Sequence, residues 1–558
     1  MIPILTTQSR LLGWAVLPML LGCGSNSGEP PKLSSVTIAP RGALIAKSVT
    51  MQFHATASYD DGSSGNAAGV VWNSSSATVA SIDPAGKATA LGAGTTFIRA
   101  EVAGVRDSTT LTVTAATASG PLRVSAVNPR YFADPSGRVV YLTGSEYWKT
   151  IQDNGQSNPP PAFDYSGFLD FLQRHNHNFT RLYMWEQARW SSEETVSSWF
   201  SPTLYERPGP GVGADGGLRF DLTRINPAYL ARVRQRVIDA GARGIYVSVM
   251  LFDGWSVEHK GSTTGSNPWQ GHPFNSANNI NGINGDPNGD GSGAETQTLS
   301  IPAVTALQEA YLKAVVDAVN DQDNVIYEIS NESNQAADAW QYHMIDVIRS
   351  YEATKPKQHA IGMTVPYPTV PSGSNSDVLN STADWVSMNG NVNDPPAADG
   401  SKVDLSDTDH LCGICGDAAW PWKSFTRGHN PLLMDGYDGS PGVGDPKYNP
   451  NDPIWDAIRT NMGYARSYAL RMDLAHALPR EDLASTGYCL AVVGREYLVV
   501  LPSGGNVTVN LSGVSGSPAV EWFRPSNGQT TAGGAIAGGG TVTLTAPFTG
   551  MAVVYIHL

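Results

Sequence analysis

An Asn-Glu pair, Asn331-Glu332, is the first candidate for chemistry in the sequence. It follows the run VIYEI at residues 325–329, whose β-branched and aromatic side chains predict a short buried strand. A carboxylic acid that directly follows a buried strand is held rigidly, as a general acid must be. The alternative is an ordinary strand-end Glu that caps a helix or faces water.

Acid/base chemistry often pairs one protonated with one ionised carboxyl group, so a second carboxylate could act with Glu332. Asp407 and Asp409 follow another predicted strand, and we rank Asp409 first, Asp407 second and Asp435 third. Each of these Asp residues could instead serve a turn or cap a helix. Glu146 and Glu186, which follow other predicted strands, are further candidates for the second acid.

Alternating strands and helices from residue 122 onward predict the elements that position these side chains. The predicted strands are 138–143, 178–184, 244–251, 325–329, 360–364, 385–388, 402–406 and 431–434. The predicted helices are 163–175, 227–240, 302–320, 337–351, 418–427 and 461–477. Eight strands with intervening helices fit a (β/α)₈ barrel over residues 122–480, with polar residues at the carboxyl ends of the strands. A doubly wound sheet is the competitor, but the sequence has no P-loop motif, and its one G-x-G-x-x-G spacing, at 211–216, follows a Pro-Gly turn.

Two β-rich modules flank the predicted barrel. Residues 33–116 contain short alternating strands separated by turns, as in a β-sandwich, and residues 484–558 alternate in the same way between Gly-rich turns. The run VWNSSS at 71–76 and the segments that follow it resemble the bacterial Ig-like (group 2) domain. That resemblance implies a spacer or an adhesion module with no chemistry of its own. We therefore expect a multidomain chain with a central TIM barrel between two β-sandwiches.

The strand-end motifs resemble clan A of the retaining glycoside hydrolases. In that clan an Asn-Glu pair ends the fourth strand and a carboxylate ends the seventh, which implies that Glu332 is the acid/base and that Asp409 or Asp407 is the nucleophile. The resemblance also implies that Arg181, in the run NFTRL at 178–182, supports the nucleophile. The clan's nucleophile is normally Glu, and an Asp side chain is one methylene shorter. The chain could therefore be an inverting enzyme, could act on an unusual sugar, or could have lost activity.

Several polar and aromatic residues follow the same strands and are candidate substrate contacts. Aromatic rings can stack on the apolar faces of sugars, although a single Trp is more often a packing residue. The candidates are Asn331, Arg181, Trp148, Trp185, Trp255, Asn389, His410 and Glu186.

The C-terminal module carries a second resemblance. GREYLVVL at 494–501 and VEWFRPSNG at 520–528 resemble the β domain named collagen-binding that follows DUF4038-like barrel glycosidases. We take the label as a name and draw no expectation of collagen binding from it.

The N-terminus resembles a bacterial lipoprotein signal. Arg10 precedes a short apolar run that ends in LLGC at 20–23, which predicts a signal peptide over 1–23, lipidation at Cys23 and a flexible tether over 24–32. Plain secretion is the alternative. Cys412 and Cys415 form a C-x-x-C motif, for which a local disulfide or two free thiols is favoured over a metal site. The loop from Asp286 starts like a calcium loop but lacks its last carboxylate.

The net charge of −14 argues against a nucleic-acid partner, because phosphate binding requires basic patches. We expect a glycoside hydrolase that acts on a poly- or oligosaccharide, needs neither cofactor nor metal, is monomeric and touches the membrane only through its lipid. A non-catalytic carbohydrate-binding or adhesion lipoprotein with a degenerate barrel is the alternative. A protease or an esterase is not supported, since the sequence has no H-E-x-x-H and no G-x-S-x-G.

Overall fold

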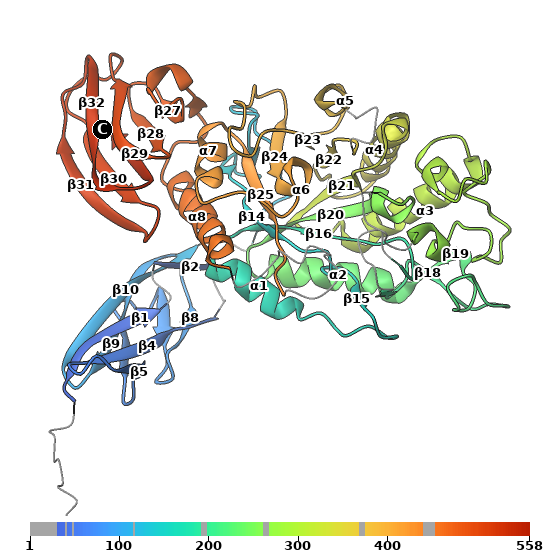
Figure 1. The fold of residues 1–558 in the computed structure, drawn as a ribbon, viewed down its shortest axis with the longest axis horizontal. Coiled ribbons are helices and arrows are strands. Elements are labelled where there is room, and N and C mark those ends of the chain that lie inside the picture. The colour runs from blue at the N-terminus through green and yellow to red at the C-terminus, as the bar shows by residue number, and fades with distance from the viewer. Residues whose placement is uncertain are drawn as a thin grey trace, which may run out of the picture.

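The computed structural model shows a parallel α/β barrel between two β-rich domains, which both lie on the left of the barrel in Figure 1. The structure describes residues 31–39, 42–46, 50–114, 118–190, 198–260, 267–367, 374–438 and 452–558. The signal peptide, Cys23 and most of the tether lie outside these residues. Within the described ranges, no helix combines the length and the apolar character that crossing a bilayer requires.

Eight parallel strands form the barrel, in the order β14-β25-β24-β23-β22-β21-β20-β16. A parallel bridge between Tyr147 and Leu182 joins the two outer strands and closes the ring. The strands are β14 (Gly144–Glu146), β16 (Phe179–Leu182), β20 (Tyr246–Asp253), β21 (Val325–Asn331), β22 (Ile361–Thr364), β23 (Trp385–Ser387), β24 (Val403–Asp407) and β25 (Asn430–Met434). The predicted fold class is confirmed, and β21 is the fourth strand and β24 the seventh.

Eight α-helices accompany the strands in the described part of the barrel (Figure 1). They are α1 (Tyr165–Arg174), α2 (Pro227–Gly241), α3 (Pro302–Val319), α4 (Asp338–Glu352), α5 (Asn375–Leu379), α6 (Thr408–Leu411), α7 (Trp420–Thr426) and α8 (Pro453–Ala469). The prediction of the last helix over 461–477 was displaced by eight residues. Asp452 caps α8 by accepting a hydrogen bond from the Ile454 N–H, and Pro453 occupies the first turn, which together fix the earlier start.

The first barrel strand also differs from its prediction. Residues 138–143 were expected to form it, but β13 (Val139–Val140) pairs antiparallel with β12 (Phe132–Ala133), which in turn pairs with β11 (Arg123–Val124). A tight turn produces this hairpin, because the Asp134 carboxylate accepts hydrogen bonds from the Ser136 and Arg138 N–H groups. The barrel strand therefore starts at Gly144 and ends at Glu146, so this carboxyl belongs to the strand itself.

Short elements lie in the connections that lead from the barrel strands to the helices that follow them. They are β15 (Asp153–Gly155), β17 (Trp199–Ser201), β18 (Tyr205–Glu206), β19 (Asp221–Ile225) and the 3₁₀ turns η1 (Gly254–Ser256), η2 (Pro268–Gly271), η3 (Ala294–Gln297) and η4 (Gln335–Ala337).

The N-terminal domain packs three small sheets around one apolar core that includes Ile38, Phe53, Ile98 and Leu111. Its strands are β1 (Leu33–Ala39), β2 (Ala43–Ala46), β3 (Thr50–Gln52), β4 (His54–Tyr59), β5 (Ser64–Asn66), β6 (Val71–Ser74), β7 (Ala80–Ile82), β8 (Lys87–Ala90), β9 (Gly94–Val102) and β10 (Val105–Thr114). Alternate residues of β9 are buried, as expected of a strand with one face on a core.

The C-terminal domain packs a six-stranded sheet, β26-β27-β28-β33-β30-β31, against the β29-β32 pair. Its elements are β26 (Leu478–Pro479), η5 (Glu481–Leu483), β27 (Cys489–Val492), β28 (Glu496–Leu501), β29 (Gly504–Asn510), β30 (Ala519–Arg524), β31 (Gln529–Ala535), β32 (Thr541–Thr549) and β33 (Ala552–His557). A shared apolar core joins this sheet to α7 and α8, where Trp422 and Tyr468 contact Phe523. Arg471 also pairs with Glu521 at 2.7 Å, so the barrel and this domain form a continuous packed unit.

Candidate active site

Glu332 lies just past the carboxyl end of β21, all seven residues of which are buried. Its backbone adopts the left-handed region at φ +43°, which is unusual for a residue other than glycine and is often held in place at functional sites. Lys260 Nζ donates to the Glu332 carbonyl oxygen at 2.5 Å, and the Glu332 N–H donates to Thr364 Oγ1 at 3.3 Å. A side chain at Gly254 would collide with that carbonyl oxygen, so this position requires glycine. Neighbouring loops therefore fix the backbone of Glu332.

The Glu332 carboxyl is 5% exposed and accepts a hydrogen bond from the Trp255 indole N–H at Oε2. Burial raises its pKa well above the usual range, and the negative charge of Asp409 raises it further. Trp255, Lys260 and Arg181 oppose the rise without cancelling it. These surroundings favour the protonated form of the carboxyl, which is the form that a general acid requires.

Arg181, on β16, is the centre of a buried cluster of carboxyl groups. Its guanidinium forms a fork with Glu328, through Nε at 2.9 Å and Nη2 at 2.8 Å. Nη1 donates to Glu146 at 3.0 Å and to Asp409 at 3.1 Å, and it lies 3.5 Å from Asp407. Four carboxyl groups, from β14, from β21 and from the end of β24 with the turn that follows it, therefore share one cation.

Asp409 and Asp407 differ in their surroundings. Asp407, the last residue of β24, caps α6 by accepting a hydrogen bond from the Asp409 N–H at 3.0 Å, and burial raises its pKa to about 8. The Asp409 side chain is 9% exposed, against 2% for Asp407. Burial raises the pKa of Asp409 too, but Arg181 opposes the rise through both its charge and its hydrogen bond. Asp409 is therefore the better placed of the two to work as an ionised carboxylate.

Asn331 connects Arg181 to a second set of polar side chains. Its Oδ1 accepts hydrogen bonds from Arg181 Nη2 at 3.3 Å and from His410 Nε2 at 3.1 Å, while its Nδ2 donates to the Tyr183 hydroxyl at 2.8 Å. His410 Nδ1 faces Ser387 Oγ at 2.7 Å, and burial keeps the pKa of this imidazole well below its usual range. A neutral His410 protonated on Nε2 fits both contacts and fixes the orientation of the Asn331 amide.

The three predicted tryptophans occupy different environments. Trp255 is half-buried and contacts Glu332 directly. Trp148 and Trp185 are 7% and 6% exposed, and the Trp185 indole N–H donates to the Trp148 carbonyl oxygen at 2.9 Å. Of the three, only Trp255 is thus in hydrogen-bond contact with a candidate catalytic carboxyl among the described residues.

The remaining predicted residues lie at the same end of the barrel. Glu186 is buried and faces His272 Nε2 at 3.4 Å. Burial, with a smaller contribution from the charge of Glu186, raises the pKa of Asp253 to about 7. Asn389 is half-buried, and its backbone exchanges two hydrogen bonds of 2.9 Å with the Asn375 side chain.

Asp435, the third candidate for the second carboxylate, pairs with Arg459 of α8. Arg459 Nε donates to Asp435 Oδ2 at 2.8 Å, and its Nη2 donates to Oδ1. This fork neutralises Asp435 outside the Arg181 cluster, so Asp435 serves the attachment of α8 to β25.

Two local motifs outside the cluster take a structural form. Cys412 and Cys415 form a disulfide directly after α6, with their Cα atoms 5.9 Å apart. In the loop that resembles a calcium site, Asp286 accepts hydrogen bonds from the N–H groups of Gly289, Asp290 and Gly291. Its carboxylate oxygens thus stabilise a turn.

Glu328 and Lys260 are the members of the site that were not predicted. The signal for Glu328 was a carboxyl group in the middle of an apolar strand, in register with the inward-facing Ile326. Lys260 has no comparable signal, because it comes from a loop 72 residues before Glu332.

Glu146, Asp407 and Asp409 each bring a carboxylate oxygen within 4.8 Å of the others, a spacing at which a metal ion could be held. However, Arg181 Nη1 contacts all three of them. The guanidinium already supplies the positive charge that a metal would bring, so these residues are a poor fit for a cation.

Three segments match known families. Residues 33–113 match the bacterial Ig-like domain (group 2), residues 185–367 match a domain of unknown function (DUF6298), and residues 478–553 match the family described as "Putative collagen-binding domain of a collagenase". Among curated proteins, ice-binding protein 1 of Shewanella frigidimarina is 36% identical over 146 residues. That match covers 24% of this chain and only 16% of the Shewanella protein.

Solved structures resemble the chain over most of its length. A glycoside hydrolase family 5 protein from Bacteroides vulgatus ATCC 8482 has a TM-score of 0.52 and 14% identity, covering 78% of this chain and 93% of that one. A second structure from the same strain, a "putative glycoside hydrolase", has a TM-score of 0.52 and 11% identity, covering 92% and 100%. Identities this low establish the fold alone. The chain therefore has a (β/α)₈ barrel with the fold of the family 5 glycoside hydrolases, set between a bacterial Ig-like domain and a C-terminal β domain of the collagen-binding type.

Proposed function

We propose that the barrel is a glycoside hydrolase in which Glu332 is the general acid/base and Asp409 is the second carboxylate. The observation that carries the proposal is the contrast between two neighbouring carboxyl groups. Burial and the charge of Asp409 raise the pKa of Glu332 well above the usual range, whereas Asp409 itself accepts a hydrogen bond from Arg181. Two carboxyl groups in opposite protonation states are what glycoside cleavage requires.

In the proposed reaction, Glu332 donates its proton to the glycosidic oxygen as the bond to the anomeric carbon breaks. In one route Asp409 attacks that carbon, and water deprotonated by Glu332 then displaces Asp409 from it, which gives retention. In the other route Asp409 removes a proton from the water that attacks directly, which gives inversion. Arg181 keeps Asp409 ionised in both cases. The anomeric configuration of the first product, followed by NMR, distinguishes the two routes.

We propose a poly- or oligosaccharide as the substrate. The Trp255 indole is half-buried beside Glu332, where its ring could pack on the apolar face of a sugar while its N–H bonds the acid. The other candidate residues at this end of the barrel are proposed to support the site. They are Arg181, Asn331, His410, Asn389, Glu186, Trp148 and Trp185.

The test is Glu332→Gln, assayed first on a glycan panel and then on aryl glycosides of the sugar that is cleaved. We expect the variant to lose about 10²–10⁴-fold in kcat on glycans, whose leaving group must be protonated. A dinitrophenyl glycoside needs no such proton, so its cleavage should fall far less. Glu309→Gln on α3, which removes a carboxylate that pairs with His343, is the control and should leave both rates unchanged.

The outcome also decides between the enzyme and the carbohydrate-binding alternative. Equal turnover of a cleaved glycan by the wild type and by Glu332→Gln would remove Glu332 from catalysis. A wild type that binds a glycan of the panel but cleaves none would favour the non-catalytic lipoprotein.

We further propose that Cys23 carries a lipid and anchors the protein at the surface of a bacterial cell. The lipobox-like sequence at 20–23 supports this proposal. Expression in a bacterial host with labelled palmitate should label the wild type and leave Cys23→Ser unlabelled. Equal labelling of both would refute it.

A further inference from the structure

A cavity of about 380 Å³ lies at the amino ends of the barrel strands, opposite the Glu332 site. Its walls come from the hairpin around Val139, from residues before β14, β16 and β20, and from the end of α8 and the segment after it. The volume falls within the range of small-molecule pockets in proteins. It is therefore large enough to hold a compact organic ligand.

Arg466, in the last turn of α8, brings a positive charge to this cavity without a matching negative one. Its Nη1 donates only to the neutral Asn176, at 3.3 Å to the carbonyl oxygen and also to Oδ1. Its Nε is buried without a hydrogen-bond partner in the described part of the chain, and no described carboxylate pairs with it. Arg466 is half-buried, and a guanidinium partly removed from water is costly unless an anion compensates it.

A second guanidinium, that of Arg138, lines the same cavity, and its Nε is paired with Asp134 Oδ2 at 3.0 Å. The charge of Arg138 lowers the pKa of Arg466 in addition to the larger effect of burial, so the two cations interact. Asp473 also lines the cavity, but its Oδ2 is bound by Arg495 at 3.1 Å and by His476 at 2.9 Å. Arg138 and Asp473 are thus each paired within the protein, and Arg466 is the charged residue of the described cavity wall that no carboxylate compensates.

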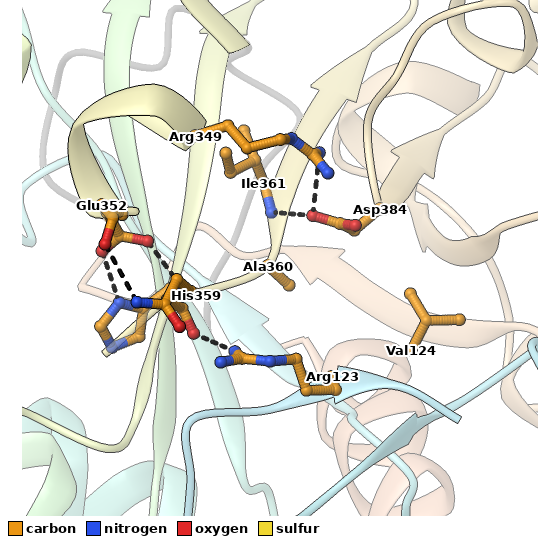
Figure 2. A pocket seen from close by; sticks show the side chains of 9 residues that line it. Arg123, Val124, Arg349, Glu352, His359, Ala360, Ile361 and Asp384 are labelled. Atoms are coloured by element: carbon orange, nitrogen blue, oxygen red, sulfur yellow. Dashed lines mark hydrogen bonds and ion pairs between the residues drawn. The ribbon is translucent and has the colours of Figure 1, made fainter. Parts of the chain in front are cut away.

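A smaller cavity of about 130 Å³ nearby shows the contrast (Figure 2). There Arg349 pairs with Asp384 at 3.3 Å, and Glu352 accepts hydrogen bonds from the backbone and the ring of His359 (Figure 2). The charge of Arg349 is thus compensated by Asp384 within the protein, whereas the charge of Arg466 is left for a ligand.

We propose that the larger cavity binds a compact organic carboxylate, with its anionic group between Arg466 and Arg138 and its apolar part on Met472 and Leu474. The planar guanidinium matches a carboxylate in geometry, and the apolar side chains of the wall favour a ligand with an apolar body. This site is independent of the chemistry proposed for Glu332.

Benzoate is a suitable probe, with benzyl alcohol as its neutral analogue and inorganic sulfate as a bare oxyanion. Isothermal titration calorimetry on the whole protein should show benzoate binding at one site, and benzyl alcohol should bind at least about tenfold more weakly. Loss of a charge-assisted hydrogen-bond partner should weaken benzoate by about 10- to 100-fold in Arg466→Gln. Arg349→Gln, which removes an arginine from the compensated cavity, should leave the affinity unchanged.

Arg138→Glu provides a second test, because this side chain is 62% exposed and its replacement should not prevent folding. The reversed charge should weaken benzoate by at least about tenfold. The proposal is overturned if either variant keeps its affinity within about twofold of the wild type, or if sulfate binds and benzoate does not.

Discussion

Replacement of Trp255 by Phe should raise the pKa of Glu332 and extend activity to higher pH. The Trp255 N–H donates to Glu332 Oε2, and this bond stabilises the ionised carboxylate. A hydrogen bond to a charged group contributes about 1.5–3 kcal/mol. Because each pKa unit corresponds to about 1.4 kcal/mol, loss of this bond should raise the pKa by about 1–2 units.

The assay is the pH dependence of kcat/KM on a cleaved glycan or aryl glycoside. The general acid must be protonated in the free enzyme, so its pKa sets the limb on which activity falls as the pH rises. In Trp255→Phe that limb should move to higher pH by about 1–2 units. The value of kcat/KM on the plateau can also fall if the ring contacts the sugar, but its loss would not move the limb.

Trp185→Phe is the matched control, because it removes an indole N–H that donates to a backbone carbonyl and not to a carboxyl. Its alkaline limb should coincide with that of the wild type. An alkaline limb that stays in place or moves to lower pH in Trp255→Phe would refute the assignment of this limb to Glu332.

Three further predictions concern the same end of the barrel. Asp409→Asn should lose about 10³–10⁵-fold in kcat while Asp407→Asn stays within about tenfold of the wild type, and similar losses in both would contradict the choice of Asp409. Because the pKa of Asp407 is about 8 in the folded state against 3.8 ordinarily, the folded protein keeps a proton that the unfolded chain loses, and stability should fall between about pH 4 and pH 8. Urea unfolding should show Asp407→Asn relieving this fall by up to about 5 kcal/mol above pH 8, and parallel curves for the two proteins would disprove it. Gly254→Ala should cost about 1–3 kcal/mol of stability and lower kcat, because its Cβ would collide with the Glu332 carbonyl oxygen, whereas Gly65→Ala has open space and should change neither.

The part of the site that lies on strand ends could be predicted from the sequence. Val325–Asn331 has a run of β-branched and aromatic residues, and the alternation of strands and helices makes it the fourth of eight strands. Parallel strands bring their carboxyl ends to one rim, so the count alone places Arg181, Asn331 and the seventh-strand Asp residues close together.

Local patterns could not predict the contacts that tune Glu332. Lys260 and Trp255 contact Glu332 from a loop more than seventy residues earlier in the chain. These contacts depend on the positive φ of Glu332 and on the absence of a side chain at Gly254. The first strand was displaced for a different reason. Residues 138–143 are apolar, but the turn at Asp134 pairs the first of them into a hairpin before the barrel strand begins.

The distribution of protons around Arg181 determines which carboxyl group can act as the second catalytic residue. One guanidinium cannot keep Glu146, Glu328, Asp407 and Asp409 all ionised in a buried site, and burial raises the pKa of each of the four. Glu328 is the carboxyl group that its hydrogen bonds favour most strongly in the ionised form. It accepts hydrogen bonds from Arg181 Nε and Nη2 and another from Ser248 Oγ at 3.2 Å.

The third guanidinium nitrogen, Nη1, is left for the other three carboxyl groups. Asp409 is the most exposed of the three, so its ionised form loses the least hydration. Glu146 and Asp407 each have one buried carboxyl oxygen that accepts no hydrogen bond in the described part of the chain. Protons on Glu146 and Asp407 would leave Glu328 and Asp409 as the two ionised carboxylates that contact Arg181. The extra acids then act as a buried, neutral support, and the charge of Asp409 keeps the proton on Glu332.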